Sequence, residues 1–244
     1  MKIIFISVII LIISKSESAN PWVGFFFNPQ ANTNGNHSKF LVDLAPLLDT
    51  LKINGVNMII FDMSYSKFHF MNDTALSAFS YGKSGGFTPS ECRQMAQMCR
   101  DRSILVGTHV QIITHSVGHV FPYVYPQYML AADPWSSSGV YYKWYSDYVK
   151  WNSATYQCAL DHVSNVNNGP PNSTFWTPVG ATSTRDPFSQ QGEKVIFGMV
   201  DELISAFTTE SGQIPEVFHI GCDELGWWYK NPVALNGKTS AEIF

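Results

Sequence analysis

Apolar residues gather in short continuous runs, separated by stretches in which they recur at helical spacing. One continuous run covers residues 23–27 and another covers residues 56–61. Such runs are typical of strands that are buried on both faces. Between them, apolar side chains recur at helical intervals from Phe40 to Leu51, and Gly55 supplies a stop. The pattern predicts a strand, an amphipathic helix and a second strand.

The next helix has the clearest start signal in the chain. Thr88 suits the N-cap, Pro89 the first helical position and Glu91 the third, which together form a capping box. This helix is predicted to run to about Arg102. Residues 104–113 then predict a third strand.

Residues 120–188 do not continue the alternation of strand and helix patterns, because they are rich in Pro, Gly, Asn, Ser and aromatic residues. We interpret this region as a long, partly helical excursion rather than a separate domain. A last amphipathic helix, with apolar residues between Val195 and Phe207, leads into a fourth strand at residues 217–221. Four aromatic residues of the excursion fall on one helical face: Tyr141, Trp144, Tyr148 and Trp151.

Buried strands that alternate with helices pair in parallel through right-handed crossovers. A (β/α)₈ barrel and an open doubly wound sheet both satisfy this order. The absence of GxGxxG after the first strand disfavours the dinucleotide-binding version. Polar residues collect just after the strands, where a barrel builds its site. We therefore expect an α/β fold of the (β/α)₈ TIM-barrel type, with only about the first four βα units present.

Composition and charge narrow the classes of partner. The chain has 244 residues, of which 45% are hydrophobic and 14% charged, as in a globular protein with one sizeable core. A formal net charge of −4 without a basic stripe disfavours nucleic acid. Four cysteines without a CxxC pair argue against a zinc site, and no cofactor is indicated.

The first 18 residues are typical of a signal peptide. Lys2 is followed by an apolar run over residues 3–13 and by small residues at 16–19. The run is too short for a bilayer, which needs about 20 residues, although a buried first strand or an uncleaved anchor is the alternative. No other segment is long and apolar enough to cross a membrane, so the mature protein is expected to be soluble.

Three glycosylation sequons support passage through a secretory compartment. We therefore expect a glycoprotein that is secreted or resides in a lysosomal or vacuolar lumen. The sequons begin at Asn36, Asn72 and Asn172.

The fourth strand runs directly into an acidic and aromatic segment, His219-Ile220-Gly221-Cys222-Asp223-Glu224-Leu225-Gly226-Trp227-Trp228. Neighbouring side chains in a regular strand point to opposite faces. Where the strand ends, both carboxylates can reach one cleft, and their repulsion beside tryptophans raises at least one pKa, as a general acid requires. The same Asp-Glu pair also suits the start of a following helix.

The segment from His219 to Glu224 closely resembles the HxGGDE motif of glycoside hydrolase family 20, the β-N-acetylhexosaminidases. Its cysteine variant, HIGCDE, is most similar to the hexosaminidase D branch. Further short motifs occur in the family's order over roughly residues 22–232. The resemblance implies that residues 20–244 form the N-terminal half of a catalytic barrel that releases terminal N-acetylglucosamine or N-acetylgalactosamine. The further motifs are Asn54-Gly55, Thr88-Pro89-Ser90-Glu91 and Gly118-His119.

The resemblance also implies substrate-assisted, retaining catalysis. Asp223 orients the substrate's 2-acetamido group, whose oxygen attacks C1 to give an oxazolinium intermediate. Glu224 protonates the departing glycosidic oxygen and then accepts a proton from water. Trp227 and Trp228 are candidates for the wall of the sugar site, with core packing as the alternative. His119 matches the family's Gly-His and is either a substrate contact or a hydrogen-bonded structural histidine.

Several positions depart from the family. No arginine follows the first strand, where residues 28–31 are Asn-Pro-Gln-Ala. The second strand lacks the family's His-x-His and ends in Phe61-Asp62, which makes Asp62 a candidate sugar ligand. His115 lies where the hexosaminidase D branch has a glutamine, and no role is assigned to it. Only about twenty residues follow the fourth strand, which suggests a truncated chain or a half completed by a partner.

Two other classes of function remain open. One is an inactive glycan-binding or structural protein that keeps the motif without a complete pocket. The other is a barrel hydrolase with Glu224 as the acid and a nucleophile elsewhere.

Overall fold

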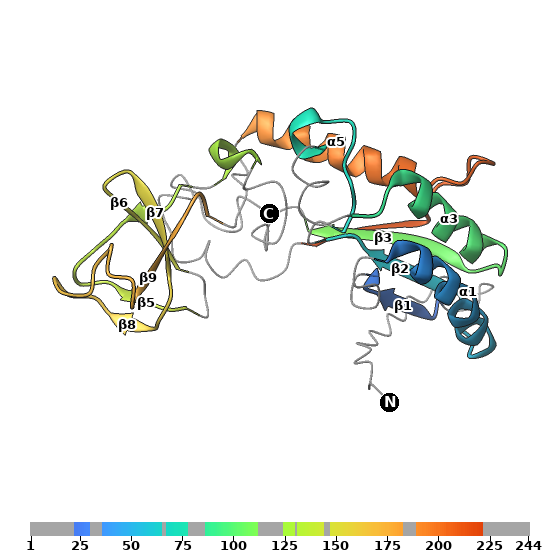
Figure 1. Cartoon of the computed structure of the whole chain (residues 1–244), viewed down its shortest axis with the longest axis horizontal. Coiled ribbons are helices and arrows are strands. Elements are labelled where there is room, and N and C mark those ends of the chain that lie inside the picture. Colours follow the sequence, from blue (N-terminus) through green and yellow to red (C-terminus); the bar gives the residue numbers. More distant parts are fainter. Residues whose placement is uncertain are drawn as a thin grey trace, which may run out of the picture. The chain divides into compact units, whose positions relative to one another are not determined.

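The computed structural model divides the chain into two compact units, and each is described by itself (Figure 1). The first comprises residues 1–110 and 197–220, and the second comprises residues 111–196 and 221–244. The structure describes residues 22–29, 36–64, 67–77, 86–111, 124–129, 131–143, 147–182 and 189–221.

The first unit is built on a four-stranded sheet with the order β1-β2-β3-β10. β1 pairs with β2 and β2 with β3, both in parallel, and the register places Phe27 opposite Phe61 and Asp62 opposite His109. The predicted parallel α/β arrangement is therefore confirmed for these strands. The strands are β1 (Gly24–Phe27), β2 (Met58–Asp62), β3 (Leu105–Gln111) and β10 (Val217–Gly221).

Alternation along the strands gives this sheet two different faces. Phe27 stacks on Phe40 with ring centroids 5.8 Å apart, and Phe61 stacks on Phe207 at 5.5 Å. This face packs against the helices, because Phe40 lies in α1 and Phe207 directly follows α5. The helices of the unit are α1 (His37–Ile53), α3 (Pro89–Arg100) and α5 (Gln190–Ala206), of which α5 belongs to this unit from Phe197 onward.

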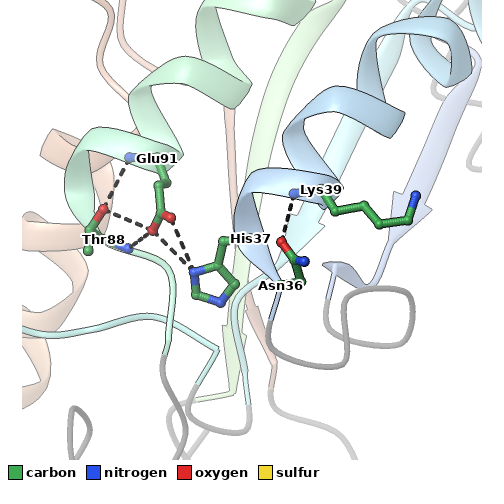
Figure 2. Close-up of polar contacts among 5 residues, drawn as sticks. All are labelled: Asn36, His37, Lys39, Thr88 and Glu91. Carbon is green, nitrogen blue, oxygen red and sulfur yellow. Dashed lines mark hydrogen bonds and ion pairs between the residues drawn. The ribbon is translucent and has the colours of Figure 1, made fainter.

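The helix boundaries follow the sequence signals closely. Gly55 has a φ of +84°, a left-handed conformation that glycine adopts without strain, just after α1 ends. At the start of α3 the capping box is complete (Figure 2): the Glu91 amide donates to the Thr88 hydroxyl at 3.3 Å, and the Thr88 amide donates to the Glu91 carboxylate at 2.8 Å. α3 ends at Arg100, close to the predicted end.

We expect Thr88→Ala to reduce the free energy of unfolding by about 1 kcal/mol, because it removes a side-chain acceptor from the start of α3. Ser90→Ala is the matched control, since Ser90 is an exposed hydroxyl two positions along the same helix. Urea unfolding of both variants measures the difference. Equal stability of the two variants would mean that the cap contributes nothing.

The second unit corrects the prediction of a partly helical excursion. Tyr141 lies in a strand, and Tyr148 and Trp151 lie in another, so they do not share a helical face. The region lies within the second compact unit, and its interpretation as an excursion rather than a separate domain stays a prediction. Its strands are β4 (Asp133–Pro134), β5 (Val140–Tyr141), β6 (Tyr148–Trp151), β7 (Ala154–Cys158), β8 (His162–Val163) and β9 (Trp176–Val179), with a 3₁₀ helix, η3, at Pro126–Tyr128.

A hairpin and its buried core explain why this region forms strands rather than a helix. Asn152 and Ser153 both have positive φ, as a two-residue hairpin turn requires, and they join β6 to β7. The strands form the orders β4-β6-β7-β9 and β5-β8. Trp176 packs in a buried cluster with Val149 and Cys158. Of the aromatic residues that gave the helical spacing, Tyr141 packs against this β-sheet core.

Within the ranges described above, no helix has the length and apolar character that crossing a membrane requires.

Candidate active site

The structure places one of the predicted site residues, Asp62, at the last position of β2. The motif that carries the predicted carboxylates begins on β10, which supplies His219 and ends at Gly221. The other predicted site residues lie outside the described residues: His119, Asp223, Glu224, Trp227 and Trp228. His115 also lies outside them.

Polar side chains occupy the sheet face opposite Phe27 and Phe61. Asp62 and His109 lie on adjacent strands in register, and the His109 ring lies 4.7 Å from the His219 ring between centroids. Phe26 contacts the same histidine edge to face at 5.2 Å. Residues from β1, β2, β3 and β10 therefore meet around His109. The strand that leads into the predicted catalytic motif contributes to this cluster.

Asp62 is the most heavily bonded group on this face. One carboxylate oxygen, Oδ1, lies 2.9 Å from His109 Nδ1 and accepts from the Ser64 amide at 3.0 Å. The other, Oδ2, accepts from the ammonium group of Lys67. Asp62 is 5% exposed and Lys67 is 2% exposed. The carboxylate is thus held by three donors, and its role as a sugar ligand stays a prediction.

Burial alone would raise the pKa of Asp62, because a low-dielectric surrounding disfavours its charge. The hydrogen bond from His109 and the charge and hydrogen bond of Lys67 together outweigh burial. They hold the pKa of Asp62 well below its usual range. An ionised Asp62 also favours the His109 tautomer with its proton on Nδ1, which leaves Nε2 as an acceptor.

Lys67 reaches this position because the segment after β2 is tied down twice. The Phe87 amide donates to the Lys67 carbonyl at 2.6 Å, and the His69 amide donates to the Phe87 carbonyl at 2.9 Å. Farther along, buried Glu202 of α5 accepts from the backbone amides of Met71 and Asn72.

Burial lowers the pKa of Lys67, and the facing Asp62 carboxylate opposes this effect.

Sequence reasoning missed His109 and Lys67. For His109 a signal was present, because a strand buried on both faces carried a titratable residue at the position that pairs with Asp62. Lys67 gave no comparable signal. It lies five residues beyond Asp62, and only the contact between Phe68 and Phe87 brings its ammonium group back to the strand end.

Thiol chemistry has little support in the described part of the chain. Cys92, Cys99 and Cys158 are free and buried. Burial raises the pKa of Cys99 to about 12 and that of Cys158 to about 11, so both remain protonated at neutral pH. Among the residues that the structure describes, no group of three or more His, Cys, Asp or Glu side chains is placed to hold a metal ion.

The Asp62 cluster predicts a specific acid sensitivity. Because the folded-state pKa is depressed, the ion contributes stability above the pKa of an unfolded aspartate, about 3.9, and this contribution is lost as pH falls below it. We expect the urea midpoint of the wild-type chain to fall more steeply between about pH 5 and about pH 2.5 than that of Asp62→Asn. Parallel curves for the two proteins would contradict this assignment.

The fold that carries this cluster is similar to that of a solved chitobiase. The chain aligns with the chitobiase of Flavobacterium johnsoniae with a TM-score of 0.54 and 16% identity, covering 91% of this chain and 28% of that one. At this identity the likeness shows the fold alone. No protein-family model and no curated protein matches the sequence.

Two further family 20 structures align with lower scores. The exo-β-N-acetylglucosaminidase of Vibrio harveyi, solved with N-acetylglucosamine, has a TM-score of 0.48 and 13% identity, covering 81% of this chain and 27% of that one. A family 20 β-N-acetylglucosaminidase has a TM-score of 0.45 and 12% identity, covering 76% of this chain and 34% of that one. The chain thus spans about a third or less of the length of these enzymes.

Proposed function

We propose that the chain is the catalytic part of a β-N-acetylhexosaminidase-like glycoside hydrolase that releases terminal N-acetylhexosamine. One observation carries the proposal: β10 brings His219 to His109 on the polar sheet face, and the next residues along the chain are Cys222, Asp223 and Glu224. In an α/β barrel the residues after a strand build the active site. The fold shared with a chitobiase supports the same class of enzyme.

In the proposed mechanism Asp223 accepts the N–H of the substrate's acetamido group and so directs its carbonyl oxygen at C1. As that oxygen bonds to C1, the glycosidic C–O bond breaks, and the leaving oxygen takes the Glu224 proton. Water then attacks C1 and gives its proton to the Glu224 carboxylate. The oxazolinium ring opens with retention, and the acid is restored.

The remaining predicted residues support this chemistry. Trp227 and Trp228 form the wall against which the sugar ring packs, and His119 contacts the substrate or serves as a hydrogen-bonded structural histidine. Asp62 lies on the polar sheet face, where its hydrogen-bonded carboxylate fixes the position of His109. Of these groups, Asp62 has contacts that argue for a positioning role, because its oxygens already accept from Ser64, Lys67 and His109.

We further propose that the four strands of this sheet are the first four of a (β/α)₈ barrel, within residues 20–244. The order β1-β2-β3-β10, with helices against one face and polar groups on the other, supports this arrangement. Residues 1–18 are proposed to direct export and then be removed. The protein acts outside the cell or in a lysosomal or vacuolar lumen on glycosides of N-acetylglucosamine or N-acetylgalactosamine.

A second candidate function is glycan binding without hydrolysis. One observation favours it: β1 ends at Phe27, and the four residues that follow contain no arginine to grip the sugar hydroxyls. Calorimetry with N-acetylglucosamine, together with long incubation on an aryl N-acetyl-β-glucosaminide, separates the two functions. Heat of binding without release of the aryl group identifies the binding protein, whereas release identifies the enzyme.

A further inference from the structure

The side chain that begins α1 is also the first residue of a glycosylation sequon. Asn36 is exposed, and its Oδ1 accepts from the Lys39 backbone amide at 2.9 Å, which makes it the N-cap of α1 (Figure 2). The sequon is completed by His37 and Ser38, and Ser38 is also exposed. One asparagine therefore carries a structural task and a modification signal.

These two tasks use different atoms of the amide. Capping requires only the oxygen as an acceptor. The bond to Lys39 also fixes which end of the amide faces the helix, because only Oδ1 can accept from a backbone N–H. Nδ2 is consequently the end that does not take part in the cap. Attachment at Nδ2 leaves the acceptor lone pairs of Oδ1 in place.

The middle residue of the sequon is anchored, which holds Asn36 in place. The His37 ring stacks on Phe87 with centroids 4.0 Å apart, and its Nδ1 lies 3.2 Å from the Glu91 carboxylate. Glu91 belongs to the capping box of α3, so the starts of α1 and α3 are joined through this histidine (Figure 2). His37 thus points into the unit while its neighbours Asn36 and Ser38 stay exposed.

The sequon at Asn172 has a different geometry. Its Oδ1 accepts from the Thr174 amide at 3.1 Å, and its Nδ2 donates to the Asn167 carbonyl at 3.1 Å. The residue is half-buried. Both ends of this amide are therefore engaged within the second unit, and the nitrogen that would carry a sugar already has a partner in the fold.

We infer that Asn36 is an N-glycan acceptor, used in preference to Asn172, and that the glycan and the helix cap coexist on one side chain. The inference rests on the proposed passage through a secretory compartment. The co-reactant is a lipid-linked oligosaccharide pyrophosphate. Its anomeric C–O bond breaks as the C1–Nδ2 bond forms, Nδ2 loses one proton, and the lipid pyrophosphate leaves.

The test is to express the full chain in a eukaryotic secretory host and to release N-glycans enzymatically in heavy-oxygen water. Release converts each glycosylated asparagine to labelled aspartate, which peptide mass spectrometry locates. We expect label at position 36, little at Asn172, and loss of the label at 36 in Ser38→Ala. Sequencing of the mature N-terminus reports in the same sample whether residues 1–18 have been removed.

Two variants test the coexistence of glycan and cap. Ser38→Ala removes the sequon but keeps the cap, and Asn36→Ala removes both. With the glycans left in place, the glycosylated wild-type protein is expected to melt no lower than Ser38→Ala, and Asn36→Ala at a lower temperature than either. An unlabelled Asn36 in a protein that has lost its leader would overturn this inference alone. An unglycosylated protein that retains residues 1–18 would overturn the proposed export as well.

Discussion

Glu224→Gln is expected to lose almost all hydrolysis of an aryl N-acetyl-β-glucosaminide, by about a hundredfold to ten-thousandfold in turnover. Glutamine has nearly the same size as glutamate but cannot deliver a proton to the departing oxygen. It also cannot accept the proton of the incoming water. Both halves of the proposed reaction therefore fail in this variant, while substrate binding is retained. The absorbance of the released aryl alcohol measures the loss of turnover.

Glu210→Gln supplies the matched control, because Glu210 is exposed and lies on the turn after α5. This variant is expected to keep wild-type turnover. Asp223→Asn is expected to lose turnover as well, since an amide offers the acetamido N–H a weaker acceptor than a carboxylate. Undiminished turnover in Glu224→Gln would remove the assignment of Glu224. An inactive wild-type chain that binds N-acetylglucosamine would instead favour the glycan-binding function.

Local signals predicted the first unit well because its elements depend on contacts that are close in sequence. The capping box of Thr88 and Glu91 satisfies two backbone groups within four residues, so it could be recognised without tertiary information. Gly55 marks the end of α1 for the same reason. Runs of apolar residues identified the strands, since both faces of a parallel sheet are buried.

The second unit was misjudged because spacing alone does not distinguish a short strand from a helix turn. Tyr148 and Trp151 stand three residues apart, as on a helix, yet both lie in β6. What decides their conformation is the turn at Asn152 and Ser153 together with packing around Trp176. The turn lacks the Asn-Gly pair that usually announces a hairpin, and the packing partners are distant in sequence.

The candidate site was likewise predicted only in part. Asp62 could be named from the sequence because it ends a predicted strand. Its surroundings could not, because the register between β2 and β3 and the return of Lys67 are tertiary facts. The structure adds that this candidate sugar ligand is held by buried donors.

This buried cluster leads to the largest expected effect on stability. Asp62→Asn keeps the shape of the side chain but removes its charge, and it leaves Lys67 without a counter-charge in a site where the lysine is 2% exposed. Removing one partner of a buried ion pair typically costs about 3–5 kcal/mol. Hydrogen exchange of the amides in β2 and β3 measures this for the first unit alone. A loss of that size corresponds to exchange about a hundredfold to several thousandfold faster.

Asp43→Asn is the control, because it breaks the Lys39–Asp43 pair of α1, whose side chains are 67% and 58% exposed. Solvent screens that pair, so its loss is expected to change stability by no more than about 0.5 kcal/mol. The double variant Asp62→Asn/Lys67→Met removes the uncompensated charge and is expected to regain part of the stability that Asp62→Asn loses. The size of this recovery gives the coupling between the two residues. Strictly additive effects would mean that Lys67 and Asp62 do not stabilise each other, and that the polar face is held together by the hydrogen bonds of His109 and Ser64 instead.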